Sequence, residues 1–290
     1  MMTAQILDGR ACASQIEKEI IAEISKISRP PHLVVVIVGD DPASKVYVGN
    51  KIKTCKRLGI RSTLIEKKAD ISESLLVSLI QELNDDDDVD GILIQSPLPN
   101  HLDEMMLTDL LDPNKDVDGF HPINLGRLVQ GRTDGLIPCT PHGIIRLLNH
   151  YQIPLQGKQA VVIGRSRIVG MPMSLLLASQ DCNATVTITH SKTEDLAEVV
   201  KKADIVIAAV GRAEMIDNTW IKPGCVVVDV GINRVDDASH ERGWKLSGDA
   251  HPNVSTKASW VSPVPGGVGP MTVMMLMQNT VNAAKKRRQK

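Results

Sequence analysis

The sequence predicts an α/β fold built around mostly parallel sheets. Short apolar runs rich in Val and Ile alternate with amphipathic stretches, which is the pattern of repeated strand and helix units. The chain has 290 residues, of which 42% are hydrophobic and 23% are charged. This is the composition of an ordinary globular protein, and the length suits one large domain or two medium ones.

Seven segments have the composition of strands, being short, rich in β-branched residues and mostly bounded by turn residues. They are Leu33–Gly39, Ser62–Lys67, Gly91–Gln95, Ala160–Gly164, Ala184–His190, Asp204–Gly211 and Cys225–Gly231. Helices are expected between them. One covers Gly9 to Lys26, and two others open at Asp41-Pro42 and Thr140-Pro141, where a capping residue precedes a proline.

The domain boundary is expected in the segment from Asp112 to Thr140, which lacks an uninterrupted periodic pattern and is rich in turn residues. We therefore predict a first domain over residues 1–139 and a second over 140–270. The segment 271–290 reads as a helix with a basic last turn. We expect this helix to pack back on the first domain.

Composition excludes several classes of function. A formal net charge of −1 and only six aromatic residues argue against a nucleic-acid partner. The five cysteines are scattered without metal-binding spacing, which favours a reduced cytoplasm and predicts no metal site. The sequence has no secretory signal and no run long enough to span a membrane, and the acidic run Asp85 to Asp88 reads as a solvated turn.

A candidate dinucleotide site follows the strand that ends at Gly164. Gly164 allows a tight turn, Ser166 offers a hydroxyl, and Gly170 permits close backbone approach before a helix whose N-terminus attracts phosphate. The spacing departs from G-x-G-x-x-G, because serine replaces the second glycine and the last glycine comes one position late. The alternative is a plain strand-to-helix turn.

The end of the next strand favours NADP over NAD. His190-Ser191-Lys192 supplies no acid to grip a ribose hydroxyl, whereas Arg165 and Ser191 could bind a 2′-phosphate. Alternatively, Ser191 caps the following helix in a box with Glu194. Ile232, after the last of the seven strands, is expected on the nicotinamide side.

A second candidate site lies on the helix opened by Asp41-Pro42. Tyr47 and Lys51 are four residues apart and share a face with Cys55 and Leu58. A lysine withdrawn from water can act as a general acid and base near neutral pH. The alternative has no catalytic role: the lysine packs its aliphatic stem on the surface and keeps its amine in water, beside a half-buried tyrosine.

Three further segments have the polarity or stiffness of a binding site. Gln95 ends a strand before two prolines that restrict its loop, and Asp118 precedes a glycine in K-D-V-D-G. The alternatives are a capping glutamine and a turn aspartate. The loop from Pro263 to Pro270 contains Pro265 and Gly266 and would let a flat ligand approach its backbone.

These motifs, taken together and in order, resemble the bifunctional methylenetetrahydrofolate dehydrogenase/methenyltetrahydrofolate cyclohydrolase family. The resemblance runs nearly end to end. It rests on D-D-P-A-S-x-x-Y-V-x-x-K-x-K from Asp40, Q-S-P-L-P from Gln95, K-D-V-D-G from Lys115, P-C-T-P from Pro138, G-R-S-x-x-V-G-x-P from Gly164 and P-V-P-G-G-V-G-P-M-T from Pro263. One departure is Ala250-His251-Pro252 after the Gly248-Asp249 pair, where the family commonly has a valine and an aromatic residue.

The resemblance implies two α/β domains flanking a cleft, the second one Rossmann-like and binding NADP, and a homodimer joined through that domain. It implies oxidation of methylenetetrahydrofolate followed by hydrolysis of the methenyl cation to formyltetrahydrofolate. Transferred by motif position, Lys51 is the acid and base, Gln95 orients it, Tyr47 packs on the pterin and Asp118 holds the amidine edge.

By the same transfer, Ser44, Pro265 and Gly266 support or bind the folate. The NADP site then consists of Gly164, Arg165, Ser166, Ser191 and Ile232. Two other functions stay open: a different NADP-dependent reductase on the same scaffold, and a carrier that binds folate or nucleotide without turnover. Hydrolysis of methenyltetrahydrofolate without any nucleotide distinguishes the first reading from both alternatives.

Overall fold

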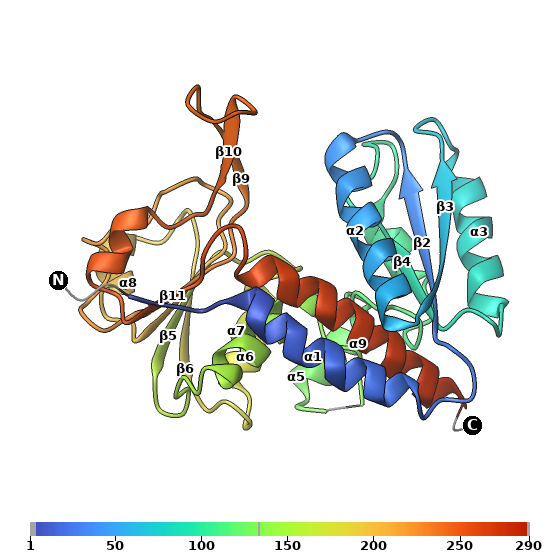
Figure 1. Cartoon of the computed structure of the whole chain (residues 1–290), viewed down its shortest axis with the longest axis horizontal. Helices are drawn as coiled ribbons and strands as arrows, with labels where there is room; N and C mark the ends of the chain where they lie inside the picture. Colours follow the sequence, from blue (N-terminus) through green and yellow to red (C-terminus); the bar gives the residue numbers. More distant parts are fainter. Residues whose placement is uncertain (1–3, 133, 289–290) are drawn as a thin grey trace. The chain divides into compact units, whose positions relative to one another are not determined.

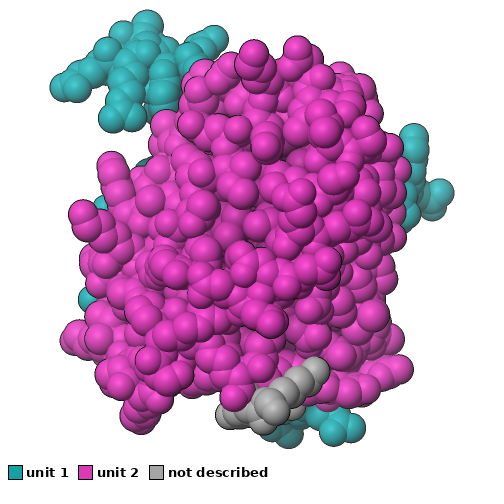
Figure 2. Space-filling model, turned by 90° about the vertical axis from the view of Figure 1, so that its right-hand side faces the viewer, with its two compact units in different colours: residues 1–14, 140–272 teal, residues 15–139, 273–290 magenta. Residues whose placement is uncertain are grey.

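The computed structural model describes residues 4–132 and 134–288 and confirms the α/β class. The chain divides into two compact units. Unit 1 consists of Met1–Ser14 and Thr140–Thr272, and unit 2 of Gln15–Cys139 and Val273–Lys290. Segments far apart in the sequence thus form one continuous body in unit 2 (Figure 2). The expected return of the C-terminal helix to the first half is confirmed for its residues from Val273 onward.

Unit 2 is organised around a three-stranded parallel sheet in the order β3-β2-β4. The strands are β2 (His32–Val38), β3 (Arg61–Lys67) and β4 (Gly91–Ile94). Every residue of β2 is buried, as expected for a central strand covered on both faces. Alternate β2 residues, from Val34 to Val38, pack against Leu76 and Ile80 of α3 (Glu73–Asp85). Figure 1 shows α2 (Pro42–Leu58) on the other side of this sheet.

The ends of α2 form as the sequence predicts. The Asp41 carboxylate accepts a 2.7 Å hydrogen bond from the Ser44 amide, and Pro42 occupies the first turn, where no donor is needed. The helix ends at Gly59, whose φ of 78° is in the left-handed region that favours glycine. These two caps fix which residues of α2 face the sheet.

Four further helices have two or more of their described residues in unit 2. Two of them are short, α4 (Glu104–Asp109) and α5 (Pro122–Val129), and α5 lies in the segment from Asp112 to Thr140 where the sequence shows no uninterrupted periodic pattern. The other two, α1 (Gly9–Ile24) and α9 (Val268–Arg288), have residues in both units. The last turn of α9 is anchored within unit 2, because Arg288 forms an ion pair with the fully buried Asp90.

Unit 1 contains a six-stranded parallel sheet in the order β1-β11-β8-β7-β5-β6. Its strands are β1 (Gln5–Ile6), β5 (Gln159–Ile163), β6 (Thr185–Thr189), β7 (Ile205–Ala208), β8 (Val226–Asp229) and β11 (Trp260–Val261). A separate antiparallel hairpin is formed by β9 (Asn233–Asp236) and β10 (Trp244–Ser247). The helical elements are α6 (Cys139–His150), α7 (Gly170–Ala178), α8 (Leu196–Val200) and the 3-10 turn η1 (Pro252–Thr256).

The strand order of unit 1 creates a topological switch point at β5. The chain leaves β5 for β6 on one side and then returns to β7 on the other. In open α/β sheets, ligands bind beyond the carboxyl ends of the strands at such a point. The order therefore places the candidate dinucleotide motif, which begins at Gly164 directly after β5, where this fold binds ligands.

All seven strands expected from the sequence are present, with ends shifted by at most three residues. The five cysteines are free and buried. None of the described helices combines the length and apolar character that crossing a bilayer requires.

Candidate active site

The row of residues on α2 runs from an exposed aromatic ring to the buried core. Tyr47 is 45% exposed, Lys51 is half-buried, and Cys55 and Leu58 are buried. Tyr47 is one of only two tyrosines in the chain, and an exposed ring next to a partly desolvated amine suits the binding of a flat ligand. Ser44, one turn earlier, is buried, so its backbone and side chain support this end of the helix.

Gln95 comes directly after β4, and at this carboxyl end of the strand its side chain contacts Lys51 of α2. The Lys51 Nζ donates a 3.0 Å hydrogen bond to the Gln95 Oε1. The Gln95 Nε2 donates to the Ser96 carbonyl at 2.6 Å, so both ends of the amide are fixed. Neither of these two hydrogen bonds of the Gln95 side chain, to Lys51 and to the Ser96 carbonyl, caps a helix.

The two aspartates of K-D-V-D-G have separate environments. Asp116 is buried and accepts hydrogen bonds from the amides of Gly119 and His121 and from the Asn124 side chain. Asp116 is thus the turn aspartate. Within the described chain, Asp118 makes no such bond, and it is half-buried. Its carboxylate is left free for a ligand.

Burial raises the pKa of Asp118 to about 6, the positive charge of Lys51 opposes this rise, and the negative charges of Asp116 and Glu104 add to it. Lys51 and Asp118 therefore interact electrostatically within unit 2. A carboxylate with a raised pKa beside a fixed amine is typical of a functional site.

Three sets of contacts hold the segment that carries Asp118 in place. Lys115 is fully buried, and its Nζ donates to the carbonyls of Leu83, Asn84 and Asp86 at the end of α3. The Asn279 Nδ2 of α9 donates to the Val117 carbonyl at 2.8 Å. Gly119 has a φ of 80°, and a Cβ there would lie 2.6 Å from the Ile137 carbonyl carbon. The glycine of this motif is therefore required for close backbone packing.

In unit 1, a cavity of about 330 Å³ opens at the carboxyl ends of β5, β6 and β7. Three residues that the sequence predicts for the cofactor, namely Gly164, Arg165 and Ser166, line this cavity together with Ser191. His190, Val210 and Arg212 also line it. The structure thus brings together four of the five predicted cofactor residues.

The loop after β5 has the close backbone geometry of a phosphate site. Gly164 has a φ of 118°, and a Cβ there would lie 2.2 Å from the Ala209 carbonyl oxygen. A Cβ on Gly170 would lie 2.2 Å from the Gly164 carbonyl oxygen. The Ser166 hydroxyl accepts from the amides of Val169 and Gly170 and so holds the loop against the start of α7. Both glycines are structurally required, which distinguishes this loop from a plain turn.

The alternative role for Ser191, as the cap of the next helix, is wrong. The helix α8 begins only at Leu196, and its cap position is Asp195 in the left-handed conformation, without a side-chain cap bond. The Thr193 hydroxyl instead accepts from the His190 amide at 2.9 Å. The Ser191 side chain is exposed at the cavity and available to a ligand.

The residues around this cavity fit NADP. Its lining contains two arginines, Arg165 and Arg212, and no acidic side chain among the described residues. A planar guanidinium next to a serine hydroxyl suits a phosphate monoester, whereas an NAD site would place a carboxylate at the end of β6.

The remaining predicted residues lie elsewhere. Ile232 is 48% exposed in the loop after β8 and is not part of the cavity lining. Pro265 is exposed, and Gly266 has a φ of 114°, where a Cβ would lie 3.4 Å from the Arg10 Nε. Both belong to unit 1, whereas Tyr47, Lys51, Gln95 and Asp118 belong to unit 2.

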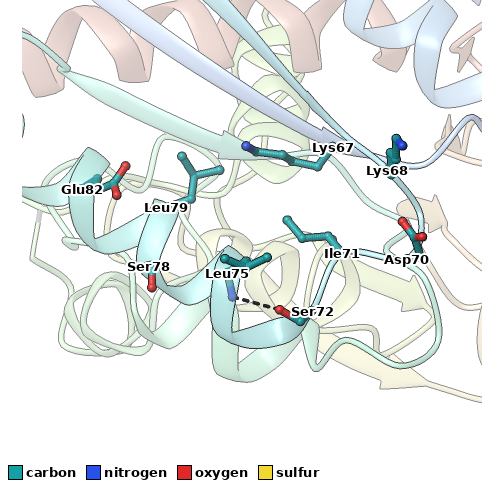
Figure 3. Close-up of a pocket in the computed structure, with 9 residues that line it drawn as sticks. All are labelled: Lys67, Lys68, Asp70, Ile71, Ser72, Leu75, Ser78, Leu79 and Glu82. Atoms are coloured by element: carbon teal, nitrogen blue, oxygen red, sulfur yellow. Dashed lines mark hydrogen bonds between the residues drawn. The ribbon is translucent and has the colours of Figure 1, made fainter.

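Unit 2 also has an open groove of about 620 Å³ between the end of β3 and α3 (Figure 3). It is lined by a mixture of basic, acidic and apolar side chains, among them Lys67, Asp70, Leu75 and Glu82. None of the predicted site residues lines this groove. A lining of mixed charge does not select for a ligand of either sign.

Sequence reasoning missed three residues around the cofactor cavity. Arg212 and His190 line it directly, and the Asp249 carboxylate binds the backbone of the loop that contains Arg212. Two features of the sequence could have indicated these residues, namely the glycine after β7 and the Gly248-Asp249 pair. Neither forms a periodic pattern or a motif of fixed spacing, so neither stands out in the sequence.

Two family models match the chain. The catalytic domain of tetrahydrofolate dehydrogenase/cyclohydrolase matches residues 7–118, and the NAD(P)-binding domain of the same family matches residues 138–288. The first match contains Lys51, Gln95 and Asp118. The second contains the cavity at the end of β5.

Relatives match over nearly the full length. The chain is 50% identical to the bifunctional protein FolD of Chlorobium chlorochromatii, over 96% of this chain and 97% of that protein. The bifunctional FolD enzyme of Campylobacter jejuni superposes with a TM-score of 0.93 at 44% identity, covering 98% of this chain and 99% of the other. The Trypanosoma brucei enzyme, solved with NADP cofactor and inhibitor, has a TM-score of 0.94 at 36% identity and full coverage of both chains.

Proposed function

Because this chain belongs to the tetrahydrofolate dehydrogenase/cyclohydrolase family, we propose that it carries out both reactions of that family with NADP as its cofactor. In the first reaction, 5,10-methylenetetrahydrofolate is oxidised to the 5,10-methenyl cation. In the second, water converts that cation to 10-formyltetrahydrofolate. The products belong to one-carbon metabolism.

In the hydrolytic reaction, the Lys51 amine is the group that moves protons. Water adds to the methenyl carbon while one of its protons passes to the Nζ of Lys51. The bond from that carbon to N5 then breaks as the new hydroxyl becomes the formyl oxygen, and the proton of that hydroxyl is passed to N5. The net change is uptake of one water and release of one proton. Gln95 holds the Nζ through its 3.0 Å hydrogen bond, so the amine is in position before the substrate arrives.

Two residues bind and orient the pterin in this proposal. The exposed ring of Tyr47 packs on the flat pterin face. The Asp118 carboxylate, which lacks a hydrogen-bond partner in the described chain, accepts from the amidine edge. Ser44, Pro265 and Gly266 are the proposed supporting contacts to the folate.

NADP, when bound, supplies the acceptor for the hydride that leaves the methylene carbon. The residues of this chain bind and position that cofactor: Gly164 and Ser166 at its phosphates, and Arg165 with Ser191 at its 2′-phosphate. Ile232 is the proposed contact on the nicotinamide side. Hydride transfer requires positioning and exclusion of water, but no proton acceptor.

The observation that carries this function is the fixed Lys51–Gln95 pair with a free Asp118 carboxylate in the same unit. A carrier of folate or nucleotide has no need for an oriented amine. A reductase for another substrate has no need for a proton-transfer group next to a pterin-binding carboxylate.

An ultraviolet assay of the purified protein tests the proposal. With methylenetetrahydrofolate and NADP, reduced nucleotide and the methenyl species are followed together. In a second assay, methenyltetrahydrofolate is supplied without nucleotide, and we expect it to be hydrolysed. A carrier shows turnover in neither assay. A reductase for another substrate leaves the methenyl compound to its uncatalysed rate.

A homodimer formed through unit 1 and a cytoplasmic location complete the proposal. The strand β6 is at the edge of the sheet, and its residue Ile188 is 39% exposed, which supports pairing with a second copy. Sedimentation equilibrium of the full chain distinguishes a dimer from a monomer.

A further inference from the structure

Two buried carboxylates lie beyond the carboxyl end of the unit 1 sheet, and the reactions proposed above do not use them directly. Asp229 is the last residue of β8 and is 4% exposed, and Asp249 is fully buried. An acidic side chain is rarely buried unless it has several partners. Their contacts indicate what they do.

Asp249 accepts from the backbone of three consecutive residues. Its Oδ2 accepts from the amides of Val210 and Gly211 at 2.7 and 3.0 Å, and its Oδ1 accepts from the amide of Arg212 at 2.8 Å. Consecutive backbone amides that converge on one anion are a known way to fix a loop. Val210 and Arg212 line the cofactor cavity, so the carboxylate fixes part of the cavity wall.

The same carboxylate also reaches the loop after β8. The Asn233 Nδ2 donates to the Asp249 Oδ1 at 2.9 Å. A Cβ on Gly231 would lie 2.2 Å from that oxygen, so the loop requires glycine there. Asp249 therefore joins the loops that follow β7 and β8, and Ile232 lies between the two residues that contact it.

Asp229 in turn fixes Asp249. The Asp229 Oδ1 accepts from the amides of Gly231 and Asp249 at 3.1 and 2.8 Å, and its Oδ2 accepts from the amide of Ala250 at 2.9 Å. A Cβ on Gly248 would lie 1.8 Å from the Asp229 Oδ2. The two carboxylates form a packed network that leaves little freedom to either loop.

We propose that Asp249 is a positioning residue for the dinucleotide: its carboxylate pre-organises the loops after β7 and β8, so that Arg212 and Ile232 are in place before the cofactor binds. This inference rests on the proposed function. A loop held in its binding conformation loses less entropy on binding, so the effect of Asp249 appears mainly as affinity for NADP.

The test is Asp249→Asn in the full chain. Each oxygen of Asp249 accepts two hydrogen bonds, so in either orientation the new amide nitrogen faces two N–H donors. The matched control is Asp204→Asn. Asp204 also accepts a hydrogen bond from a backbone amide, that of Gln159, but it lies at the amino end of β7, whereas the cavity lies at the carboxyl end of that strand.

Three measurements separate positioning from general stability. Titration calorimetry gives the Kd for NADP, and hydrogen exchange of the protein without cofactor reports on the amides of residues 210–212. The tryptophan signal in near-ultraviolet circular dichroism reports on the fold of unit 1 alone, because Trp220, Trp244 and Trp260 are the three tryptophans of the chain.

For Asp249→Asn we expect the Kd for NADP to rise at least about tenfold, since two hydrogen bonds to a charged group are lost. We also expect faster exchange at residues 210–212, an unchanged tryptophan signal, and hydrolysis of methenyltetrahydrofolate within about twofold of wild type. The control retains the wild-type Kd. A variant Kd within twofold of wild type would overturn the inference, and so would weak binding accompanied by loss of the tryptophan signal.

Asn233→Ala is the second variant, and it tests the positioning role of Asp249 if Asp249→Asn does not fold. It removes only the side-chain bond between the two loops, so a Kd about threefold or more above wild type is expected, with the tryptophan signal intact. An unchanged Kd in this variant contradicts the role of the network. Failure of the wild-type chain to bind NADP would instead contradict the proposed function.

Discussion

The Nζ of Lys51 and the Oε1 of Gln95 lie 3.0 Å apart and join α2 to the loop after β4. Each residue restricts the other. The glutamine amide is held by the Ser96 carbonyl, and the lysine is held by the glutamine. This pair gives unit 2 one oriented amine at the edge of its sheet.

Replacement of that amine separates the two proposed activities. Lys51→Met is expected to lower the rate of methenyltetrahydrofolate hydrolysis at least about 100-fold, because a positioned proton-transfer group typically contributes that much or more. Oxidation of methylenetetrahydrofolate is expected to fall much less. Stopped-flow absorbance with each substrate measures both rates, and the exposed Lys56→Met on the same helix is the control. Hydrolysis at the wild-type rate would remove Lys51 from the mechanism.

The choice between NADP and NAD is expected to depend on Arg165. Arg165→Ala removes a guanidinium that can form charge-assisted hydrogen bonds with a phosphate, and such bonds contribute about 1.5–3 kcal/mol. The kcat/KM with NADP should therefore fall about tenfold or more, while kcat/KM with NAD stays constant. Lys202→Met, an exposed cation of unit 1 outside the cavity, controls for net charge. An equal loss with both nucleotides would contradict a contact with the 2′-phosphate.

Asp118 is expected to reduce stability in a pH-dependent way. Because burial raises its pKa from 3.8 to about 6, the folded chain retains a proton that the unfolded chain releases between about pH 4 and 6. Stability is therefore lost as the pH rises through this window. Asp118→Asn should leave Tm unchanged at pH 4 and raise it by a growing amount up to pH 6, with a constant gain above.

Thermal unfolding followed by circular dichroism at a series of pH values measures this effect. The exposed Asp85→Asn in the same unit is the control. A Tm difference for Asp118→Asn that does not vary with pH would contradict the raised pKa. The same variant should bind folate more weakly, which is the usual conflict between stability and function at a binding site.

Lys115 is expected to be one of the most sensitive positions for the stability of unit 2. Lys115→Met keeps the apolar stem but leaves the carbonyls of Leu83, Asn84 and Asp86 without this donor. We expect a loss of about 3 kcal/mol in the free energy of unfolding, since buried groups are left unpaired. Urea unfolding followed by far-ultraviolet circular dichroism measures it. A loss no larger than that of the exposed Lys68→Met would show that the three bonds contribute little.

Much of the fold follows from local patterns in the sequence. Most of the seven strands are rich in apolar and β-branched residues, and Asp41-Pro42 marks the start of α2 because a cap and a proline satisfy the first turn. The pairing of Lys51 with Gln95 is implied by the family resemblance and by no local pattern, and the structure contains a hydrogen bond between the two side chains. The two-residue strands β1 and β11 could not be predicted, since two residues contain no period.

The less predictable features depend on contacts between distant residues. Either aspartate of K-D-V-D-G could have formed the turn, and only the bonds from His121 and Asn124 show that it is Asp116. Ser191 and Glu194 have the spacing of a capping box, but the left-handed Asp195 moves the start of α8 to Leu196. The network around Asp249 connects residues 210–212, 229–233 and 249–250, which no local window contains.

The bond from Asn279 to the Val117 carbonyl has a consequence for biosynthesis. The segment that bears Asp118, the carboxylate proposed to bind the pterin, is supported by α9, whose residues are translated more than 150 positions after it. A nascent chain can form the sheet of unit 2 early, but it cannot lock this segment until those late residues have been made. Ribosome-bound intermediates of unit 2 should therefore be open to proteases around Val117, and they should become resistant only when α9 has docked.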